Sequence, residues 1–370
     1  MIYLDYNATT PIDKEVADAM LPYLYGYFGN PSSSHELGIE AKNAIEKSRK
    51  QVAVLLGCTP DEILFTSGGS ESNNTVIKGV ANTYKNKGNH IITSKIEHPA
   101  IINPCKYLES IGFEVSYVPV DQYGMVNSKD VEKLITDQTI LVTIMHSNNE
   151  VGTIQPIEEI SSICKKYNVL FHTDASQSVG KVPINVESLG VDFLTVAGHK
   201  LYAPKGVGAL YIRNGVHIEP LIHGAGHESG RRAGTENIVL EVGLGKACEI
   251  SIEALKSSKI NELTDYFYSS LKKNFGDRVV LNGHPEKRLP NTLNVSFIGY
   301  NGHEVLNHLK EAAASTGSAC HSGMTSISPV LQAMGVEEDV GRGAVRFSLG
   351  RYTTKEEIDI VLNNLTEILS

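Results

Sequence analysis

The 370-residue chain has only five cysteines and no long apolar run. The cysteines are widely spaced and include no CxxC pair, so neither a disulfide framework nor a zinc or redox dithiol site is expected. The longest uncharged apolar stretches, such as residues 140–145, are far shorter than the roughly 20 residues that a membrane helix needs. The first residues lack the basic and apolar regions of a signal peptide. We therefore expect a cytoplasmic protein with no membrane segment.

The chain also lacks an excess of basic residues. Lysine and arginine total 33 against 42 acidic residues, a net charge of −9, so the surface as a whole offers no attraction for nucleic acid or an anionic membrane. Hydrophobic residues make up 41% and charged residues 20%, close to the average of folded globular proteins. The length suits one large domain and a smaller one. An acidic ligand would need a local positive pocket.

Strand-like apolar runs alternate with helix-like segments through most of the chain. Apolar or small residues recur at helical spacing over 34–55, and the following Gly57 suits a helix end. The seven strand-like runs are 63–66, 91–93, 115–118, 140–145, 169–172, 193–196 and 209–212. This alternation predicts an α/β fold with a mainly parallel, seven-stranded sheet covered by helices.

The pattern changes after about residue 250. A long polar helix, strands at 293–297 and 344–349, and a last helix with a capping box from Thr354 to Glu357 indicate a smaller α+β unit. We predict a large domain over residues 13–250. The small domain would comprise residues 1–12 and 251–370 and carry the loop around Cys320.

Residues 66–73 (TSGGSESN) directly follow a strand and open a helix. Glycines allow backbone N–H groups to turn toward an anion, and the helix N-terminus adds a favourable dipole. The segment therefore indicates a phosphate-binding loop. A plain strand-to-helix turn capped by Ser70 is the alternative.

Asp174 and Lys200 follow consecutive predicted strands, at the edge where open α/β sheets bind ligands. Pyridoxal phosphate requires this pair of residue types: a lysine for the Schiff base, and a carboxylate that keeps the pyridine nitrogen protonated. An exposed lysine and a capping aspartate are the alternative. The phosphate loop earlier in the same sheet favours the cofactor interpretation.

Six short motifs occur in one order over nearly the whole chain. They are residues 3–11 (YLDYNATTP), 29–33 (GNPSS), 97–98 (EH), 147–152 (SNNEVG), 198–200 (GHK) and 231–237 (RRAGTEN). In these motifs the chain resembles the NifS/IscS-type cysteine desulfurases of the class V aminotransferase family, and the related selenocysteine lyases. The resemblance implies a fold-type-I architecture and a homodimer with active sites at the subunit boundary.

The resemblance also implies roles for individual residues around the pyridoxal ring. His98 is expected to stack on the ring face, and Asp174 to pair with the pyridine nitrogen. Asn149 and Gln177 are expected to hydrogen-bond near the ring oxygen, and Lys200 to bind the cofactor covalently. The alternative is that His98 is a loop histidine whose hydrogen bonds are satisfied and which does not contact a cofactor.

The phosphate and substrate sites follow by the same resemblance. The phosphate would be held by the loop of Gly69 and Ser70, by His199, and by Thr235 of the partner subunit. For the substrate carboxylate the resemblance implies Arg346, with Asn30 and Asn149 beside it; an arginine fork suits a carboxylate. One residue departs from the pattern. Such desulfurases usually have a serine that binds the phosphate at the position of Ala197, and selenocysteine lyases also tend to lack this serine.

Cys320 lies in the segment 315–323 (STGSACHSG), whose small residues predict a mobile loop. A free thiol in such a loop is a candidate nucleophile, and the neighbouring His321 would favour its thiolate. A loop cysteine without a catalytic role is the alternative.

The expected activity is conversion of L-cysteine to L-alanine, with a persulfide on Cys320. The sulfur would pass to an acceptor or scaffold protein for iron–sulfur cluster or thio-cofactor synthesis. A selenocysteine lyase acting on L-selenocysteine is the nearest alternative, and a non-catalytic sulfur-carrier scaffold is an alternative of another class. A metal-dependent hydrolase is not expected, because the histidines lack metal-ligand spacing, and no metal site is predicted.

Overall fold

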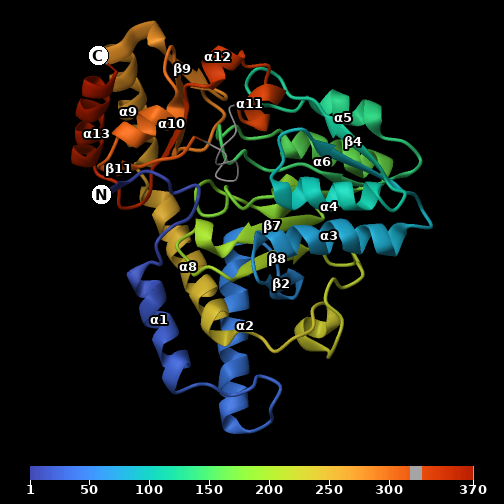
Figure 1. Ribbon diagram of the computed structural model, residues 1–370. Helices are drawn as coiled ribbons and strands as arrows, with labels where there is room; N and C mark the ends of the chain where they lie inside the picture. Colours follow the sequence, from blue (N-terminus) through green and yellow to red (C-terminus); the bar gives the residue numbers. More distant parts are fainter. Residues whose placement is uncertain (317–326, 370) are drawn as a thin grey trace.

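The computed structural model describes residues 1–316 and 327–369. Seven strands form a central sheet in the order β2-β8-β7-β6-β5-β3-β4 (Figure 1). The neighbours from β7 to β4 are parallel, whereas β8 is antiparallel to both β7 and β2. The predicted mainly parallel sheet is thus confirmed, with bounds within two residues of those expected. The strands are β2 Ile63–Thr66, β3 His90–Ser94, β4 Glu114–Val118, β5 Thr139–Thr143, β6 Leu170–Asp174, β7 Phe193–Ala197 and β8 Gly208–Ile212.

Helices cover both faces of this sheet. Side chains of α3 and α4 fill the core on one face, and those of α2, α6, α7 and α8 fill the core on the other. The helices are α1 Lys14–Tyr25, α2 Glu36–Leu56, α3 Gly69–Tyr84, α4 Pro99–Glu109, α5 Ser128–Leu134, α6 Ile157–Tyr167, α7 Val186–Leu189 and α8 Ile238–Ser257, with a 3₁₀ turn η1 at Pro60–Glu62. The sheet is therefore buried on both sides, as parallel sheets usually are.

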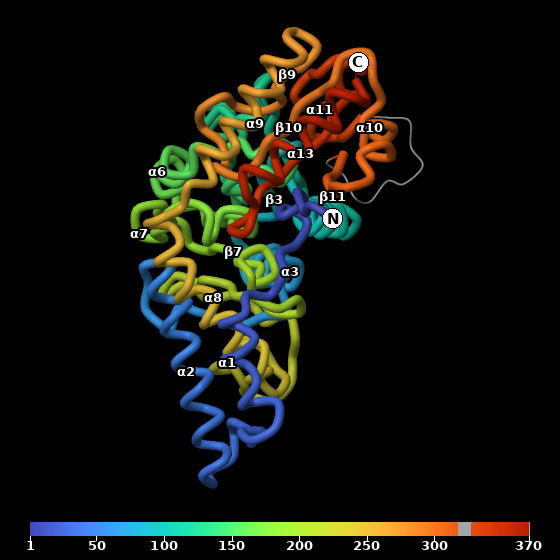
Figure 2. The backbone as a smooth tube through the Cα atoms, turned by 90° about the vertical axis from the view of Figure 1, so that its left-hand side faces the viewer, coloured from blue at the N-terminus to red at the C-terminus, as the bar shows by residue number. Residues whose placement is uncertain are grey.

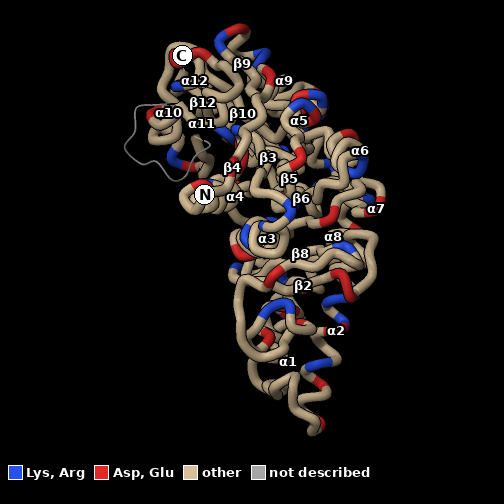
Figure 3. Tube along the Cα trace, turned by 90° about the vertical axis from the view of Figure 1, so that its right-hand side faces the viewer, with Lys and Arg blue, Asp and Glu red and all other residues tan. Residues whose placement is uncertain are grey.

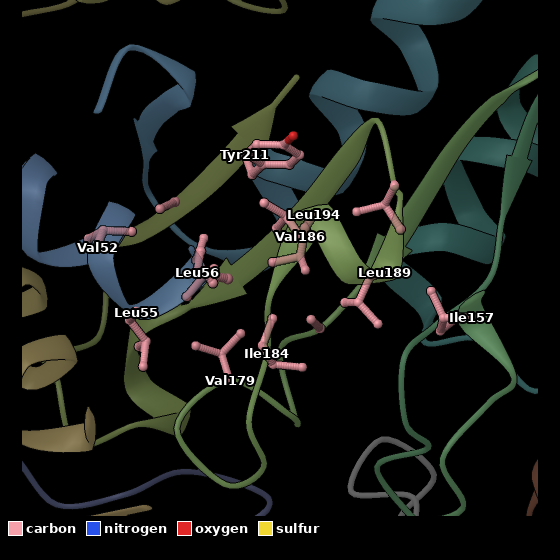
Figure 4. Packing of buried hydrophobic residues seen from close by; sticks show 14 of the residues in the cluster. Val52, Leu55, Leu56, Ile157, Val179, Ile184, Val186, Leu189, Leu194 and Tyr211 are labelled. Carbon is pink, nitrogen blue, oxygen red and sulfur yellow. The ribbon is translucent and has the colours of Figure 1, made fainter. Parts of the chain in front are cut away.

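Helix α2 confirms the helical spacing predicted over 34–55. It ends at Gly57, whose φ of 72° is a left-handed conformation that glycine adopts readily. Figure 4 shows Val52 and Leu56 of α2 in the same apolar cluster as Leu194 of β7 and Tyr211 of β8. Full burial of an aliphatic side chain of this size contributes roughly 1.5–3 kcal/mol.

The C-terminal part has a separate three-stranded antiparallel sheet in the order β12-β10-β9. The short strand β1 pairs in parallel with β11. The capping box predicted at Thr354 is present at the start of α13. The elements are β1 Ile2–Tyr3, β9 Val279–Asn282, β10 Thr292–Phe297, β11 Ala312–Ala313, β12 Ala344–Ser348, α9 Ile260–Phe275, α10 Gly302–His308, α11 Pro329–Ala333, α12 Glu338–Gly341, α13 Lys355–Ile368 and the 3₁₀ turn η4 Gly276–Arg278.

The two parts have separate apolar cores. Side chains of α8 belong to the first core and those of α9 to the second. Figure 2 shows β1 beside the C-terminal part, while α1 and α2 extend from the opposite end of the molecule. The division into domains with a boundary near residue 250 stays a prediction.

Charged residues of both signs are interspersed on the face that Figure 3 shows, for example along α6 and α9. Within the described residues, no helix is long and apolar enough to cross a membrane. The cysteines at positions 58, 105, 164 and 248 are free thiols.

Candidate active site

The topology brings three sequence motifs to one edge of the central sheet. Asp174 is the last residue of β6, and Lys200 lies in the 3₁₀ turn η2 (Gly198–Lys200) directly after β7. Because β8 is antiparallel to both of its neighbours, β2 runs in the same direction as β7. The first turn of α3, which follows β2, therefore lies at the same edge as Asp174 and Lys200. This edge is the usual ligand site of open α/β sheets.

The Asp174 carboxylate is buried and fixed by two hydrogen bonds. Its Oδ1 accepts from the backbone N–H of Ser176 at 2.9 Å, and its Oδ2 accepts from Asn73 Nδ2 at 2.7 Å. Both donors are neutral, so they orient the carboxylate without cancelling its charge. The contact of Asn73 with Asp174 was not predicted. Asn73 is the last residue of the phosphate-loop motif and lies about one helical turn after Gly69, the first residue of α3.

Lys200 is largely buried, and its Nζ donates to two backbone carbonyls. The acceptors are Asn7 O at 2.5 Å and Ala8 O at 2.7 Å. The pKa of Lys200 is lowered to about 8, first by burial and then by the positive charge of Arg346. The negative charges of Asp5 and Asp174 raise the pKa of Lys200 and partly offset this lowering. Lys200 therefore loses its proton much more readily than an ordinary lysine.

Asn7, from the N-terminal segment, links the two parts of the molecule around this lysine. Its backbone carbonyl also accepts from Gln177 Nε2 at 2.9 Å, and its Oδ1 accepts from Lys181 Nζ at 2.8 Å. Lys181 also donates to Gln177 Oε1 at 2.8 Å. A backbone carbonyl can only accept, so the contact with Asn7 O fixes which end of the Gln177 amide faces which neighbour.

The loop between β2 and α3 is suited to an anion. Gly68 has φ of 143°, a conformation that residues with side chains rarely adopt, and it precedes the N-terminus of the 16-residue helix α3. Glu71 secures the loop: it accepts from Ser67 N at 2.8 Å and pairs with Arg232 at 2.9 Å. Ser70 is exposed at this helix start.

Two further predicted residues, His199 and His98, border the same edge, as does Ala197. His199 Nδ1 lies 3.2 Å from Thr9 Oγ1, and burial together with the Lys200 charge lowers the pKa of His199 to about 4, so this imidazole is neutral. His98 is the N-cap of α4; its Nδ1 accepts from Ala100 N at 3.1 Å and its ring is exposed. Ala197, the last residue of β7, is buried beside η2.

Arg346 approaches from strand β12 of the second sheet. Its side chain is only 3% exposed, and its guanidinium donates to Asp5 Oδ1 at 2.7 Å and to Asn149 O at 2.8 Å. Its backbone forms two hydrogen bonds with Ser315, which lies just before the segment that contains Cys320. The Asp5 contact was not predicted, although Asp5 lies in the first motif.

Some predicted site residues lie elsewhere or cannot be placed. Asn30 is exposed in the connection between α1 and α2, at the far end of that helix pair from the strand ends (Figure 1). Thr235 is exposed between the 3₁₀ turn η3 (His227–Gly230) and α8. In the described parts of the chain, neither side chain hydrogen-bonds Asp174 or Lys200. Cys320 and His321 lie outside the described residues.

The chain matches the family model described as aminotransferase class-V over residues 2–361. The chain belongs to this family. It is 50% identical over 372 residues to "Cysteine desulfurase IscS" of Dictyoglomus turgidum, covering 100% of this chain and 94% of the relative. It is 46% identical over 363 residues to "Cysteine desulfurase" of Mus musculus, covering 97% of this chain and 79% of the relative. The resemblance found in the six motifs is confirmed.

Solved structures of class-V aminotransferases share the fold closely. A "NIFS-LIKE PROTEIN" superposes with a TM-score of 0.93 at 43% identity, covering 100% of this chain and 99% of that one. "SspA in complex with cysteine" superposes with a TM-score of 0.86 at 40% identity, covering 96% of this chain and 100% of that one. The predicted fold class is therefore confirmed.

Enzymes of this class-V group depend on pyridoxal phosphate, and the residues at the sheet edge fit that cofactor. Lys200 is a largely buried lysine whose hydrogen bonds, in the part of the chain that the structure describes, go to neutral carbonyls rather than to a carboxylate. Asp174 is buried, and within the described residues no cation pairs directly with its carboxylate. The start of α3 supplies N–H groups for a phosphate. Among the described residues there is no group of side chains suited to a metal ion.

Proposed function

We propose that this chain is a pyridoxal-phosphate-dependent cysteine desulfurase, which converts L-cysteine to L-alanine and retains the sulfur as a persulfide on Cys320. One observation carries the proposal: Lys200, a largely buried lysine held by two backbone carbonyls, is close enough to Asp174 and Arg346 for both charges to act on it. Asp174 suits a bound cofactor and Arg346 suits a substrate carboxylate, so groups for both are available around one lysine. The 50% identity to a cysteine desulfurase over the whole chain supports the same activity.

Each cofactor contact has a candidate residue. Lys200 would form the covalent bond, Asp174 would face the pyridine nitrogen, and His98 would stack on the ring. When bound, the cofactor supplies an electron sink for the substrate. The remaining proposed contacts are Asn149 and Gln177 at the ring oxygen, and Gly69, Ser70, His199 and the partner's Thr235 at the phosphate.

Arg346 would bind the substrate carboxylate. An arginine fork matches a carboxylate in two hydrogen bonds, and the low exposure of Arg346 strengthens such bonds. Asp5 occupies part of this fork, so the substrate has to compete with it. Asn149 lies beside Arg346, whereas Asn30 would have to act across the subunit boundary, because it is distant within one chain.

Lys200 and Cys320 would perform the chemistry on the substrate. A lysine with a pKa near 8 can take the proton from the substrate α-carbon and return protons to the product. The thiolate of Cys320 would attack the substrate sulfur, so that a sulfur–sulfur bond forms as the carbon–sulfur bond breaks. The three-carbon product leaves as L-alanine after protonation. The persulfide sulfur then passes to an acceptor protein that serves iron–sulfur cluster or thio-cofactor synthesis.

A homodimer accounts for the exposed apolar surface of the α1–α2 hairpin. This hairpin extends from the rest of the molecule in Figure 2, and a monomer would leave its large apolar side chains in water. They are Leu21, Leu24, Tyr25, Tyr27, Phe28, Leu37 and Ile39. The same surface includes Asn30, which a partner subunit would bring to the opposite active site. The free thiols suit a cytoplasmic enzyme.

The central test replaces Lys200 with alanine. The variant should release no alanine from L-cysteine, because it lacks the amine that would bind the cofactor covalently. Alanine release and the protein mass after borohydride reduction measure turnover and attachment separately. Lys205→Ala removes an exposed lysine nearby and should retain both. Alanine release by Lys200→Ala at the parent rate would refute the assignment.

A further inference from the structure

Ser176 lies two residues beyond Asp174, in the loop that approaches the first turn of α3. A methyl group placed on Gly69, the first residue of α3, would lie 2.9 Å from Ser176 Oγ. Gly69 is not among the glycines with positive φ, so its backbone does not require glycine. The close approach of the Ser176 hydroxyl therefore leaves little room for a side chain at position 69.

Only one polar side-chain atom is among the nearest neighbours of this point. Ala197 Cβ lies 3.5 Å and Thr195 Cγ2 lies 3.7 Å from the same position, and both are methyl groups. The Thr195 hydroxyl is directed to His172 Nε2, 3.0 Å away. In the described parts of the chain, the Ser176 hydroxyl has no hydrogen-bond partner. The backbone N–H of Ser176 donates to Asp174, which fixes the loop.

We propose that the Ser176 hydroxyl donates a hydrogen bond to the phosphate of pyridoxal phosphate bound at the start of α3, in place of a hydroxyl at position 197. The inference rests on the cofactor of the proposed function. An anion at the start of α3 would meet backbone N–H groups and this hydroxyl together. The loop after β6 then holds the cofactor at two points, through the Asp174 carboxylate and the Ser176 hydroxyl.

The size of the effect follows from the charge of the acceptor. Hydrogen bonds to charged groups are stronger than those between neutral groups, so removing this donor should weaken pyridoxal phosphate binding about tenfold. Pyridoxal, which lacks the phosphate, should bind the parent and Ser176→Ala equally well. The ratio of the two affinities separates a phosphate contact from a contact with the ring or a general loss of folding.

The experiment titrates the cofactor-free protein with pyridoxal phosphate and with pyridoxal, and follows the absorbance at equilibrium. The variants are Ser176→Ala, the exposed control Ser162→Ala on α6, and Ser176→Ala combined with Ala197→Ser. Thermal melting of each cofactor-free variant shows whether it is folded. We expect a tenfold loss for the phosphate form alone in Ser176→Ala, and none in the control.

The double variant tests the geometry. Because Ala197 Cβ approaches the same point, a hydroxyl at position 197 should reach the same phosphate and restore most of the lost affinity. Without this rescue, the two positions do not serve one phosphate, and that part of the proposal is wrong. An unchanged affinity ratio in Ser176→Ala would overturn the phosphate contact, as would equal losses for both ligands. If the parent binds neither ligand, the proposed cofactor itself is wrong.

Discussion

The proposed cofactor and substrate parts of the active site are built differently. Asp174, Lys200 and the start of α3 all follow strands of one sheet, so regular secondary structure positions them. Asp5, Asn149 and Arg346 come from the N-terminal segment, the connection after β5 and the second sheet. Asp5 and Arg346 are 341 residues apart in the chain. The substrate part therefore depends on how the two sheets pack, whereas Asp174 and Lys200 are placed by the strand ends of one sheet and only their contacts with Asn7 and Ala8 depend on that packing.

The two parts also differ in charge compensation. Asp174 is oriented by neutral donors, whereas Arg346 is paired with a carboxylate. Lys200 responds to charges of both parts, since Arg346 lowers its pKa while Asp5 and Asp174 raise it. Variants of these residues should affect cofactor binding, chemistry and substrate affinity separately.

Asp174→Ala should have the broadest effect, on cofactor binding and chemistry together, because it removes the charge that keeps the pyridine nitrogen protonated. We expect cofactor retention and turnover to fall together, with turnover reduced by about 100-fold or more, the size of loss typical of a deleted electrostatic group. Absorbance after gel filtration measures retention, and alanine release measures turnover. The exposed Asp339→Ala serves as the control. An unchanged rate and spectrum would rule out the role of Asp174.

Cys320→Ala should separate chemistry from binding. Alanine formation from L-cysteine should be abolished while the cofactor spectrum stays normal, because sulfur needs a nucleophile to accept it. Selenium leaves carbon more readily, so the variant should keep appreciable activity on L-selenocysteine. Alanine release from both amino acids, at saturating cofactor, measures the difference. Full activity on cysteine would show that Cys320 is not the acceptor, and equal loss of both activities would indicate another role for the thiol.

The pH dependence of cofactor capture tests the environment of Lys200. Only the uncharged amine attacks the cofactor aldehyde, so the rate of covalent capture should rise about tenfold per pH unit and level off above about pH 8. An ordinary lysine would continue to gain rate toward its usual pKa of 10.5. Stopped-flow absorbance of the cofactor-free enzyme measures this rate, with a free alkylamine as the reference. A rate that keeps rising above pH 9 would contradict the lowered pKa.

Sequence patterns predicted the cofactor part better than the substrate part. Strands β6 and β7 were expected from apolar runs, so the edge that carries Asp174 and Lys200 followed from parallel-sheet geometry. The start of α3 was indicated by its glycines. These features are local, and a local pattern is sufficient to find them.

The contacts around Arg346 could not be predicted from local sequence patterns. Its role was suggested only by the family resemblance, because no local pattern around position 346 indicates a carboxylate site. The Asp5 pair and the Asn7 contacts join segments hundreds of residues apart, and residue spacing does not reveal such partners. Asn73 is intermediate: helical periodicity places it on a face of α3, but only the packed structure directs it to Asp174.

Asp5→Asn should have the smallest effect and would sharpen the comparison of the two parts. The amide keeps a similar shape but carries no charge, so the substrate carboxylate would compete with a weaker partner for Arg346. A partly exposed ion pair of this kind is worth about 1 kcal/mol, so the KM for L-cysteine should fall about fivefold with kcat nearly unchanged. Without the Asp5 charge, the pKa of Lys200 should also fall, moving the plateau of cofactor capture to lower pH.

Steady-state kinetics measure the KM of Asp5→Asn, and the capture rates measure the change at Lys200. Asp13→Asn, which breaks the Asp13–Arg351 pair, is the matched control and should change neither. A higher KM in Asp5→Asn would mean that Asp5 orients Arg346 for the substrate rather than competing with it.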